Sequence, residues 1–185
     1  MKLCNSHYYK ILCEDKLTQC YIRRFLTAQG ISGRRIHSLP LPAAGCGEQY
    51  VRQQYPKYLK ALRTNNFNSN ILIVAIDADT KTFKERKKQL EESCIMCGIP
   101  SRTKKDKLLI FIPKRNIEKW VKYFYGESVD EETDCSHFLN GHESDCYKAA
   151  DNMSDLFSKE NFDSTLTALQ DAYEEYKALI KLINT

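Results

Sequence analysis

Asp77 and Asp79 stand two residues apart, directly after an apolar run at 71–76. Alternate side chains of an extended backbone lie on the same side, so this pair can address a single ion. Glu14 follows an earlier apolar run, and Glu118 opens a helical segment after a later one. Such oxygen ligands suit Mg²⁺ or Mn²⁺, which binds a few carboxylates together with water and substrate phosphate. The pattern therefore predicts a metal site for phosphate chemistry.

The Asp77-x-Asp79 pair also has a structural interpretation. Asp79 and Thr80 could cap the next helix while Asp77 starts a turn, and such pairs after an apolar strand are common. Glu14 favours the metal site, because carboxylates gathered at one edge repel each other and need a positive counter-charge. On the residues alone, both interpretations stay open.

The segments that must position these carboxylates alternate between strand and helix. Apolar runs and the helical 3.6-residue period predict strands at 8–13, 35–41, 71–76 and 108–112, and helices at 16–29, 48–64, 82–94 and 116–125. Two of the strands are apolar throughout, as in strands buried on both faces. The alternation predicts an open, mainly parallel α/β sheet flanked by helices, whose strand carboxyl ends share one edge.

Glu14, the Asp77-x-Asp79 pair and the segment RNIEKW at 115–120 resemble the TOPRIM domain family over roughly residues 8–125. The likeness is strongest to the overcoming-lysogenization-defect (OLD) nucleases and to TOPRIM effector subunits of ATPase-coupled phage-defence systems. Defence-type members often carry Arg-x-Ile-Glu-Asn-Tyr, to which RNIEKW is similar. The resemblance implies a TOPRIM/Rossmann-like fold, a Mg²⁺-dependent (or Mn²⁺-dependent) nuclease acting on DNA or on RNA, tRNA included, and an antiphage role with an ATPase partner.

The resemblance also implies roles for the carboxylates. Asp77 and Asp79 would hold Mg²⁺, which activates water or stabilises the leaving oxygen. Glu14 would be a ligand or general base, and Glu118 a second-site ligand or a group that orients a basic residue. The alternative is a catalytically inactive TOPRIM-like module that binds nucleic acid or a partner, since Asp15 follows Glu14 where the family commonly has glycine.

Basic residues are concentrated before position 126. Residues 1–126 hold 24 Lys+Arg against 10 Asp+Glu, whereas residues 127–185 hold 4 against 14, so charges of +14 and −10 compose the net +4. A surplus of this size is typical of a surface that meets phosphates, although solvated faces can also account for it. The predicted nucleic-acid contacts are Lys81, Lys84, Arg86, Lys87, Lys88, Arg102, Lys104 and Lys105. Lys114 and Arg115 are placed to neutralise a scissile phosphate, or are an exposed basic pair.

The composition change suggests two parts. Residues 1–126 are expected to form the TOPRIM-like catalytic domain, and residues 127–185 an acidic loop with a helical C-terminal extension, with helices near 145–156 and 162–182. The extension is expected to regulate the domain or to dock a partner. No Walker motif is present, so an ATPase would be a separate protein; homo-oligomerisation stays open.

Cysteines and glycines offer two further motifs. Cys-x2-Cys and a later Cys/His group supply ligand types for zinc, but the irregular spacing favours free thiols and no zinc site; the residues are Cys94, Cys97, Cys135, His137, His142 and Cys146. Gly45-Cys46-Gly47 lacks the P-loop ending and is interpreted as a turn. A nucleotide-binding phosphotransferase or primase-like enzyme is a third reading of the carboxylates.

No apolar run reaches the roughly 18 residues of a membrane span, and the first nine residues lack the features of a signal peptide. Eight cysteines without an export signal are expected to be reduced. The sequence therefore predicts a soluble, cytoplasmic protein with no membrane partner.

Overall fold

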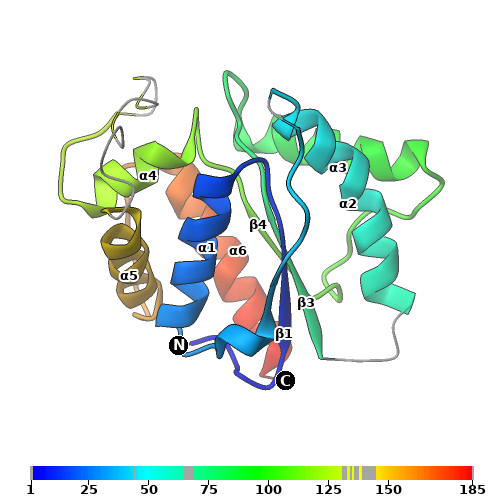
Figure 1. The fold of residues 1–185 in the computed structure, drawn as a ribbon, viewed down its shortest axis with the longest axis horizontal. Helices are drawn as coiled ribbons and strands as arrows, with labels where there is room; N and C mark the ends of the chain where they lie inside the picture. The colour runs from blue at the N-terminus through cyan, green and yellow to red at the C-terminus, as the bar shows by residue number, and fades with distance from the viewer. Residues whose placement is uncertain are drawn as a thin grey trace.

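One parallel sheet organises the computed structural model, which describes residues 2–43, 45–64, 69–130, 133, 135, 138 and 145–184. Within these residues the strands pair in the order β2-β1-β3-β4, and every pairing is parallel. The strands are β1 (Tyr8–Leu12), β2 (Ile36–Ser38), β3 (Asn70–Ala75) and β4 (Leu108–Phe111). The predicted open, parallel α/β sheet flanked by helices is confirmed (Figure 1).

Helices cover both faces of the sheet. They are α1 (Lys16–Ala28), α2 (Gly47–Thr64), α3 (Phe83–Met96), α4 (Ile117–Phe124), α5 (Asp145–Phe157) and α6 (Thr167–Ile183), with a short 3₁₀ turn at Gly33–Arg35. In Figure 1, α2 and α3 lie on one side of the strands, and α1, α4, α5 and α6 on the other. None of the described helices is long and apolar enough to cross a membrane.

The two buried faces explain why the central strand is apolar throughout. In β3, Ile73 and Ala75 belong to the core shared with α1, whereas Leu72 and Val74 belong to the core shared with α2 and α3. All four side chains are at most 2 % exposed. Alternation of side chains along a strand therefore supplies two separate hydrophobic cores.

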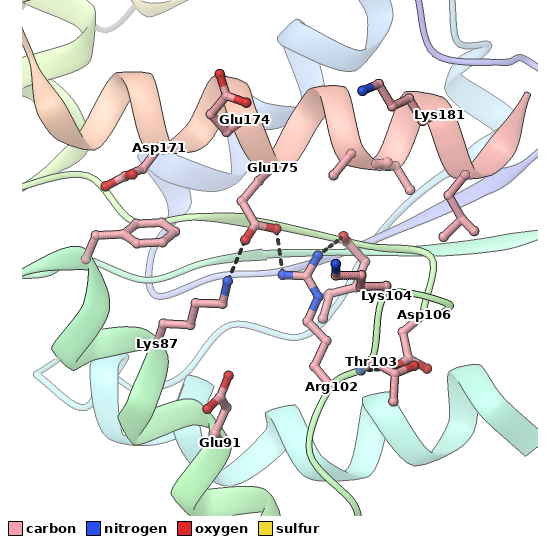
Figure 2. A pocket seen from close by; sticks show the side chains of 15 residues that line it. Lys87, Glu91, Arg102, Thr103, Lys104, Asp106, Asp171, Glu174, Glu175 and Lys181 are labelled. Atoms are coloured by element: carbon pink, nitrogen blue, oxygen red, sulfur yellow. Dashed lines mark hydrogen bonds and ion pairs between the residues drawn. The ribbon is translucent and has the colours of Figure 1, made fainter.

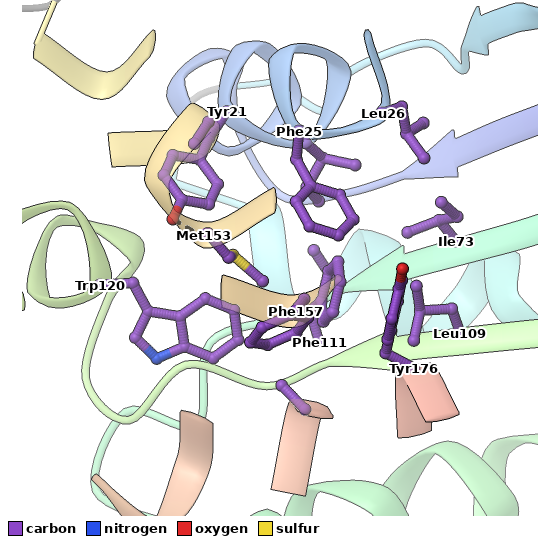
Figure 3. Close-up of a cluster of buried hydrophobic side chains, with 14 of the residues drawn as sticks. Tyr21, Phe25, Leu26, Ile73, Leu109, Phe111, Trp120, Met153, Phe157 and Tyr176 are labelled. Atoms are coloured by element: carbon purple, nitrogen blue, oxygen red, sulfur yellow. Dashed lines mark hydrogen bonds between the residues drawn. The ribbon is translucent and has the colours of Figure 1, made fainter. Parts of the chain in front are cut away.

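The C-terminal helices complete the larger core. Phe157 of α5 is fully buried, and its ring centroid lies 5.9 Å from that of Phe25 in α1 and 5.4 Å from that of Tyr176 in α6. Figure 3 shows these rings together with Phe111 of β4 and Trp120 of α4. Residues after Gly126 thus pack directly on the sheet and its helices, while the proposed domain boundary there stays a prediction.

Two elements are shorter than the patterns suggest. Strand β2 covers only three residues of the expected 35–41. Pro40 and Pro42 have no backbone N–H and therefore cannot extend the pairing. Helix α6 begins at Thr167 rather than near 162. Just before it, the Leu166 N–H donates to the Ser164 side chain at 3.1 Å, which holds this stretch outside the helix.

Candidate active site at the carboxyl edge of the sheet

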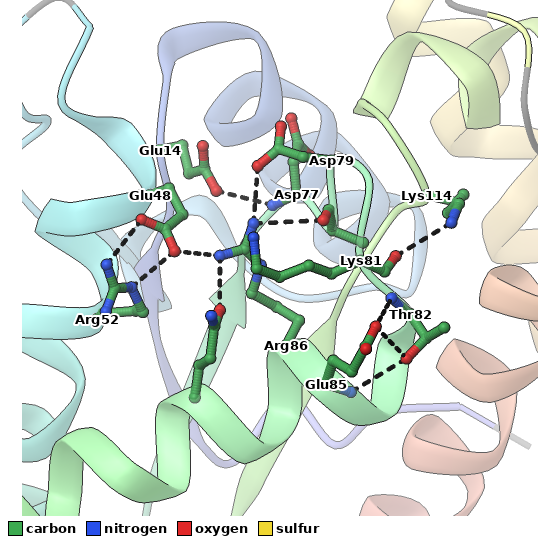
Figure 4. A network of polar contacts seen from close by, with 12 residues as sticks. Glu14, Glu48, Arg52, Asp77, Asp79, Lys81, Thr82, Glu85, Arg86 and Lys114 are labelled. Atoms are coloured by element: carbon green, nitrogen blue, oxygen red, sulfur yellow. Dashed lines mark hydrogen bonds and ion pairs between the residues drawn. The ribbon is translucent and has the colours of Figure 1, made fainter.

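Neighbouring strands bring Glu14 and Asp77 together. Leu12 of β1 is paired with Val74 of β3, so the segments that follow both strands leave the same edge side by side. The Asp77 N–H donates to Glu14 Oε1 at 2.8 Å. Figure 4 shows the Glu14 side chain directed at the backbone N–H of Asp77. This contact joins positions 63 residues apart in the sequence.

Burial and mutual repulsion govern the protonation of these carboxyls. Burial raises the pKa of Glu14 to about 7, the hydrogen bond from Asp77 opposes this rise, and the charge of Asp79 adds to it. The pKa of Asp77 is also raised well above its usual range, first by burial and then by the charges of Glu14, Asp15 and Glu118. Glu118, in the first turn of α4, is thus electrostatically part of the cluster, which is costly when fully ionised.

Asp79 takes a different partner. Its backbone has φ of +53°, an uncommon conformation for a residue with a side chain, and it forms an isolated antiparallel bridge with Arg115, which has φ of +69°. Arg86 of α3 donates to Asp79 Oδ2 at 2.7 Å. Non-glycine residues at positive φ persist where the surroundings hold them and cluster at functional sites.

Arg86 is fully buried at the centre of this network. Its Nη1 pairs with Glu48 of α2, its Nη2 also approaches the Ala78 carbonyl at 3.3 Å, and Glu48 in turn pairs with Arg52 Nε at 2.7 Å (Figure 4). The predicted nucleic-acid contact of Arg86 does not fit this burial. The residue instead joins the helices on this face to the carboxylates.

The glycine turn before α2 allows that helix to approach Glu14. A Cβ added at Gly47 would lie 2.8 Å from the Cβ of Glu14 and 3.0 Å from its Oε2, so a larger residue would displace the carboxylate. Gly45 has φ of +79°, which glycine adopts readily. The expected turn therefore also has a packing role, and it brings the first turn of α2, with Glu48, to the site.

Thr82 and Asp15 are the residues that cap helices α3 and α1. Thr82 caps α3: its side chain accepts from the Glu85 N–H at 3.2 Å, and Glu85 Oε2 accepts from the Thr82 N–H at 2.7 Å. Asp79 and Thr80 therefore do not cap α3. Asp15, in contrast, caps α1, because its Oδ1 accepts from the Thr18 N–H at 2.8 Å. Its carboxylate after Glu14 thus has a structural role.

The two basic residues after β4 lie at the same edge. Lys114 is half-buried, and its Nζ donates to the carbonyl of Lys81 at 3.2 Å. Arg115 is also half-buried, and its backbone bridges Asp79. Both residues thus lie beside the Asp77–Lys81 segment, while their contact with a phosphate stays a prediction.

The carboxyl edge has an oxygen-only donor set. Within the described part of the chain, no three His, Cys, Asp or Glu side chains are gathered as ready metal ligands; Glu14 and Asp77 are together, and Asp79 is ion-paired with Arg86. Buried carboxyls with raised pKa values nevertheless gain from a nearby cation, and all-oxygen sites suit Mg²⁺ or Mn²⁺. Glu14 and Asp77 supply oxygen donors of the type that such an ion prefers, whereas Asp79 is held by Arg86 and is not gathered with them as a third ligand.

The predicted basic segment is partly neutralised by the acidic C-terminal helix. Lys87 Nζ lies 2.8 Å from Glu175 Oε1, and Arg102 Nη1 lies 2.6 Å from Glu175 Oε2 (Figure 2). Glu175 belongs to α6, and no local sequence pattern predicts its ion pairs with Lys87 and Arg102. The side chains that remain exposed are those of Lys84, Lys88, Lys104 and Lys105, while Lys81 is half-exposed.

The cysteines of the zinc alternative do not come together. Cys94 is buried in the core on the α2 and α3 side of the sheet, and Cys146 is buried in the core on the other side. Cys97 is exposed and Cys135 is buried. His137 and His142 lie outside the described residues. Cys94 and Cys146 therefore cannot ligate the same zinc ion.

Comparisons of the chain with models of protein families, with curated proteins and with solved structures find no match. The class of protein therefore follows from the fold and the edge residues alone. The chain is an open α/β protein that carries a cluster of acidic side chains at the carboxyl edge of its parallel sheet, the edge at which this class of fold binds ligands.

The pKa of Glu14 predicts how stability depends on pH without metal. Between its ordinary value of 4.5 and about 7 the folded state holds a proton that the unfolded state has released, so stability falls as pH rises through this window, by about 3 kcal/mol for this group. Glu14→Gln should remove that part of the fall in urea unfolding measured at pH 5 and pH 8. Glu92→Gln, at an exposed position of α3, should retain it; equal slopes in both variants would contradict the prediction.

Proposed function

We propose that this chain is a metal-dependent nuclease of the TOPRIM type that cleaves nucleic-acid phosphodiesters. The observation that carries the proposal is the 2.8 Å hydrogen bond from the Asp77 N–H to Glu14, which holds the Glu14 carboxylate against the backbone of a second strand-end acid. Asp79 and Glu118 add charge at the same place. Such a cluster is costly unless a cation or a proton compensates it.

Each residue then has a task in cleavage. A divalent ion bound by Glu14 and Asp77, with the charge of Asp79 nearby, would polarise the phosphate and lower the pKa of water. Alternatively, Glu14 stays off the ion; its pKa, which burial raises to about 7, then suits it to accept a proton from that water near neutral pH. Lys114 beside the loop supplies positive charge for the phosphate oxygens.

Arg86 is a positioning residue in this scheme. It is buried and donates to Asp79 Oδ2 at 2.7 Å, which fixes the carboxylate at a backbone position that is itself strained. Its second partner, Glu48, anchors the guanidinium to α2. The orientation of Asp79 thus depends on two helices that flank the sheet.

The substrate and the biological setting extend the same proposal through the TOPRIM resemblance. We infer DNA or RNA, tRNA included, as substrate, and an antiphage effector role with an ATPase partner. The exposed lysines at 84, 88, 104 and 105 support a phosphate-binding surface without base reading. Binding by such a surface should weaken steeply with salt.

Metal removal tests the proposal. The purified chain is incubated with duplex DNA, tRNA or mixed cellular RNA, with Mg²⁺ or Mn²⁺ and with EDTA. Cleavage of at least one substrate is expected with metal and none above background with EDTA, because the proposed mechanism needs the ion to activate the attacking water. Restoration of cleavage by excess Mg²⁺ after chelation is the control. Absence of cleavage with every substrate and both metals contradicts the proposal.

A catalytically inactive binding module is the second candidate. The ion pair between Arg86 and Asp79 favours it, because a guanidinium already supplies the counter-charge that a metal would bring. This module would bind nucleic acid in a salt-dependent way and would take up no Mn²⁺ in calorimetric titration. Uptake of Mn²⁺ that Asp77→Ala with Asp79→Ala abolishes would exclude it.

A further inference from the structure

A cavity of about 280 Å³ lies between the loops after β3 and β4, the start of α3 and the start of α6. Its lining residues are Ala78, Thr82, Phe83, Lys84, Ile112, Lys114, Thr167, Ala168 and Asp171. Ala78 lies between Asp77 and Asp79 in the sequence, so the cavity reaches the segment that carries both acids, although neither carboxylate lines it.

The lining combines apolar and cationic groups. Ala78, Ile112 and Ala168 are small or aliphatic, and the Phe83 ring adds an aromatic surface. Two ammonium groups, those of Lys84 and Lys114, stand against a single carboxylate, that of Asp171. A site that combines apolar and aromatic side chains with cationic ones can stack a base and bind its phosphate.

A larger neighbouring cavity has the opposite balance. It has a volume of about 640 Å³, shares Phe83 and Asp171 with the smaller one, and carries four cationic side chains against five carboxylates. Glu175 already neutralises Lys87 and Arg102 there (Figure 2). A phosphate is therefore favoured in the smaller cavity.

The Phe83 ring is held between the two cavities. Lys87 Nζ lies 5.6 Å from the centroid of this ring, and Lys87 lines only the larger cavity. Because Glu175 ties Lys87 in place at 2.8 Å, the ammonium covers the ring from the larger cavity. Phe83 is half-buried, packs against the core on the α2 and α3 side of the sheet, and also lines the smaller cavity.

We propose that the 280 Å³ cavity binds one nucleotide of a nucleic-acid strand, with the base against Phe83 and a phosphate held by Lys84 and Lys114. This rests on the proposed function and names the part of the substrate next to the cleaved phosphodiester. The volume is close to the lower limit of small-molecule sites, roughly 300 Å³, and so suits one nucleotide rather than a longer segment. Three of the nine lining residues, Thr167, Ala168 and Asp171, come from α6, outside the 8–125 segment.

The test measures binding in EDTA, which separates it from cleavage. Wild type is titrated by NMR with the four 5′-ribomononucleotides, a single-stranded hexanucleotide, ribose 5-phosphate and inorganic phosphate. Lys84→Ala should weaken nucleotide binding about tenfold, because it removes a charge-assisted hydrogen bond. Lys60→Ala, at an exposed position of α2 that does not line the cavity, should change it less than about twofold. Phe83→Leu should weaken nucleotides while leaving phosphate binding unchanged.

The variants and ligands distinguish a nucleotide site from diffuse charge attraction and from simple phosphate binding. Nucleotide and hexanucleotide binding that is sensitive to Lys84 and Phe83 but not to Lys60 supports the site, even if no cleavage is ever detected. Free mononucleotides that bind while the hexanucleotide does not would overturn the assignment to a strand. Equal losses of nucleotide binding in the two lysine variants would indicate diffuse electrostatic attraction and would overturn the proposal. Inorganic phosphate that binds as tightly as the nucleotides would exclude contact with the base and would also overturn it. A lack of all binding would do the same.

Discussion

Asp77→Asn is expected to reduce Mg²⁺-dependent cleavage by on the order of 10³-fold, equivalent to ~4 kcal/mol of transition-state stabilisation. The amide keeps the volume of the side chain and the N–H that Glu14 accepts. It removes a charge from a site whose pKa values are raised by crowded carboxyls. The variant should therefore fold at least as stably as wild type while losing metal affinity. Single-turnover cleavage and thermal unfolding of the same preparation measure both effects.

Asp155→Asn is the matched control for this prediction. The same chemical change is made at an exposed position of α5, and cleavage should stay within about twofold of wild type. Nucleic-acid binding in EDTA should be unchanged or stronger in Asp77→Asn, since a negative charge is lost beside the phosphate. Retention of more than a tenth of the wild-type rate in Asp77→Asn would remove Asp77 from the catalytic site.

Phe157→Ala is expected to destabilise the whole chain by ~3–5 kcal/mol, the range for large-to-small changes in a well-packed core. The Phe157 ring is fully buried, with ring centroids of Phe25, Phe162, Tyr173 and Tyr176 all within 6 Å. Because these rings come from α1 and the C-terminal segment together, the loss should affect both parts. Urea unfolding followed by far-ultraviolet circular dichroism and by Trp120 fluorescence should show one shifted, coincident transition.

Tyr147→Ala on the same helix is the control, since its side chain is 47 % exposed. Its effect should stay within about 0.5 kcal/mol. If Phe157→Ala instead produced two transitions, with the Trp120 signal retained after helix is lost, residues 127–185 would unfold as a unit of their own. That result would favour the division at residue 126 over one cooperative core.

The strands and the chemistry at their ends were predictable because both are local in sequence. An uninterrupted apolar run such as 71–76 indicates a strand buried on both faces, and parallel strands end at a common edge. From these two rules Glu14 and Asp77 were expected to meet, and the 2.8 Å contact between them agrees with that expectation. The α6 start was less predictable, because a single hydrogen bond from the Leu166 N–H to the Ser164 side chain competes with the helix.

The partners of the charged residues were not predictable. Arg86 was grouped with exposed lysines because it stands among them in the sequence, yet the fold buries it between Glu48 and Asp79. Glu175 is distant in sequence from Lys87 and Arg102, and only the packing of α6 onto the sheet places it between them. Charge counts per segment carry no information about such pairs, because an ion pair depends on distance in space.

By itself, the sequence determined the succession of strands and helices along the chain and the two buried faces of β3, because both follow from periodicity. It also determined which acidic residues follow the strands at one edge of the sheet. The tertiary structure alone decided that Asp79 faces Arg86, that Gly47 leaves room for Glu14, and that α6 lines part of a cavity beside the loop after β3. These features arise from side chains on elements far apart in the chain, whose meeting is decided by core packing rather than by local pattern.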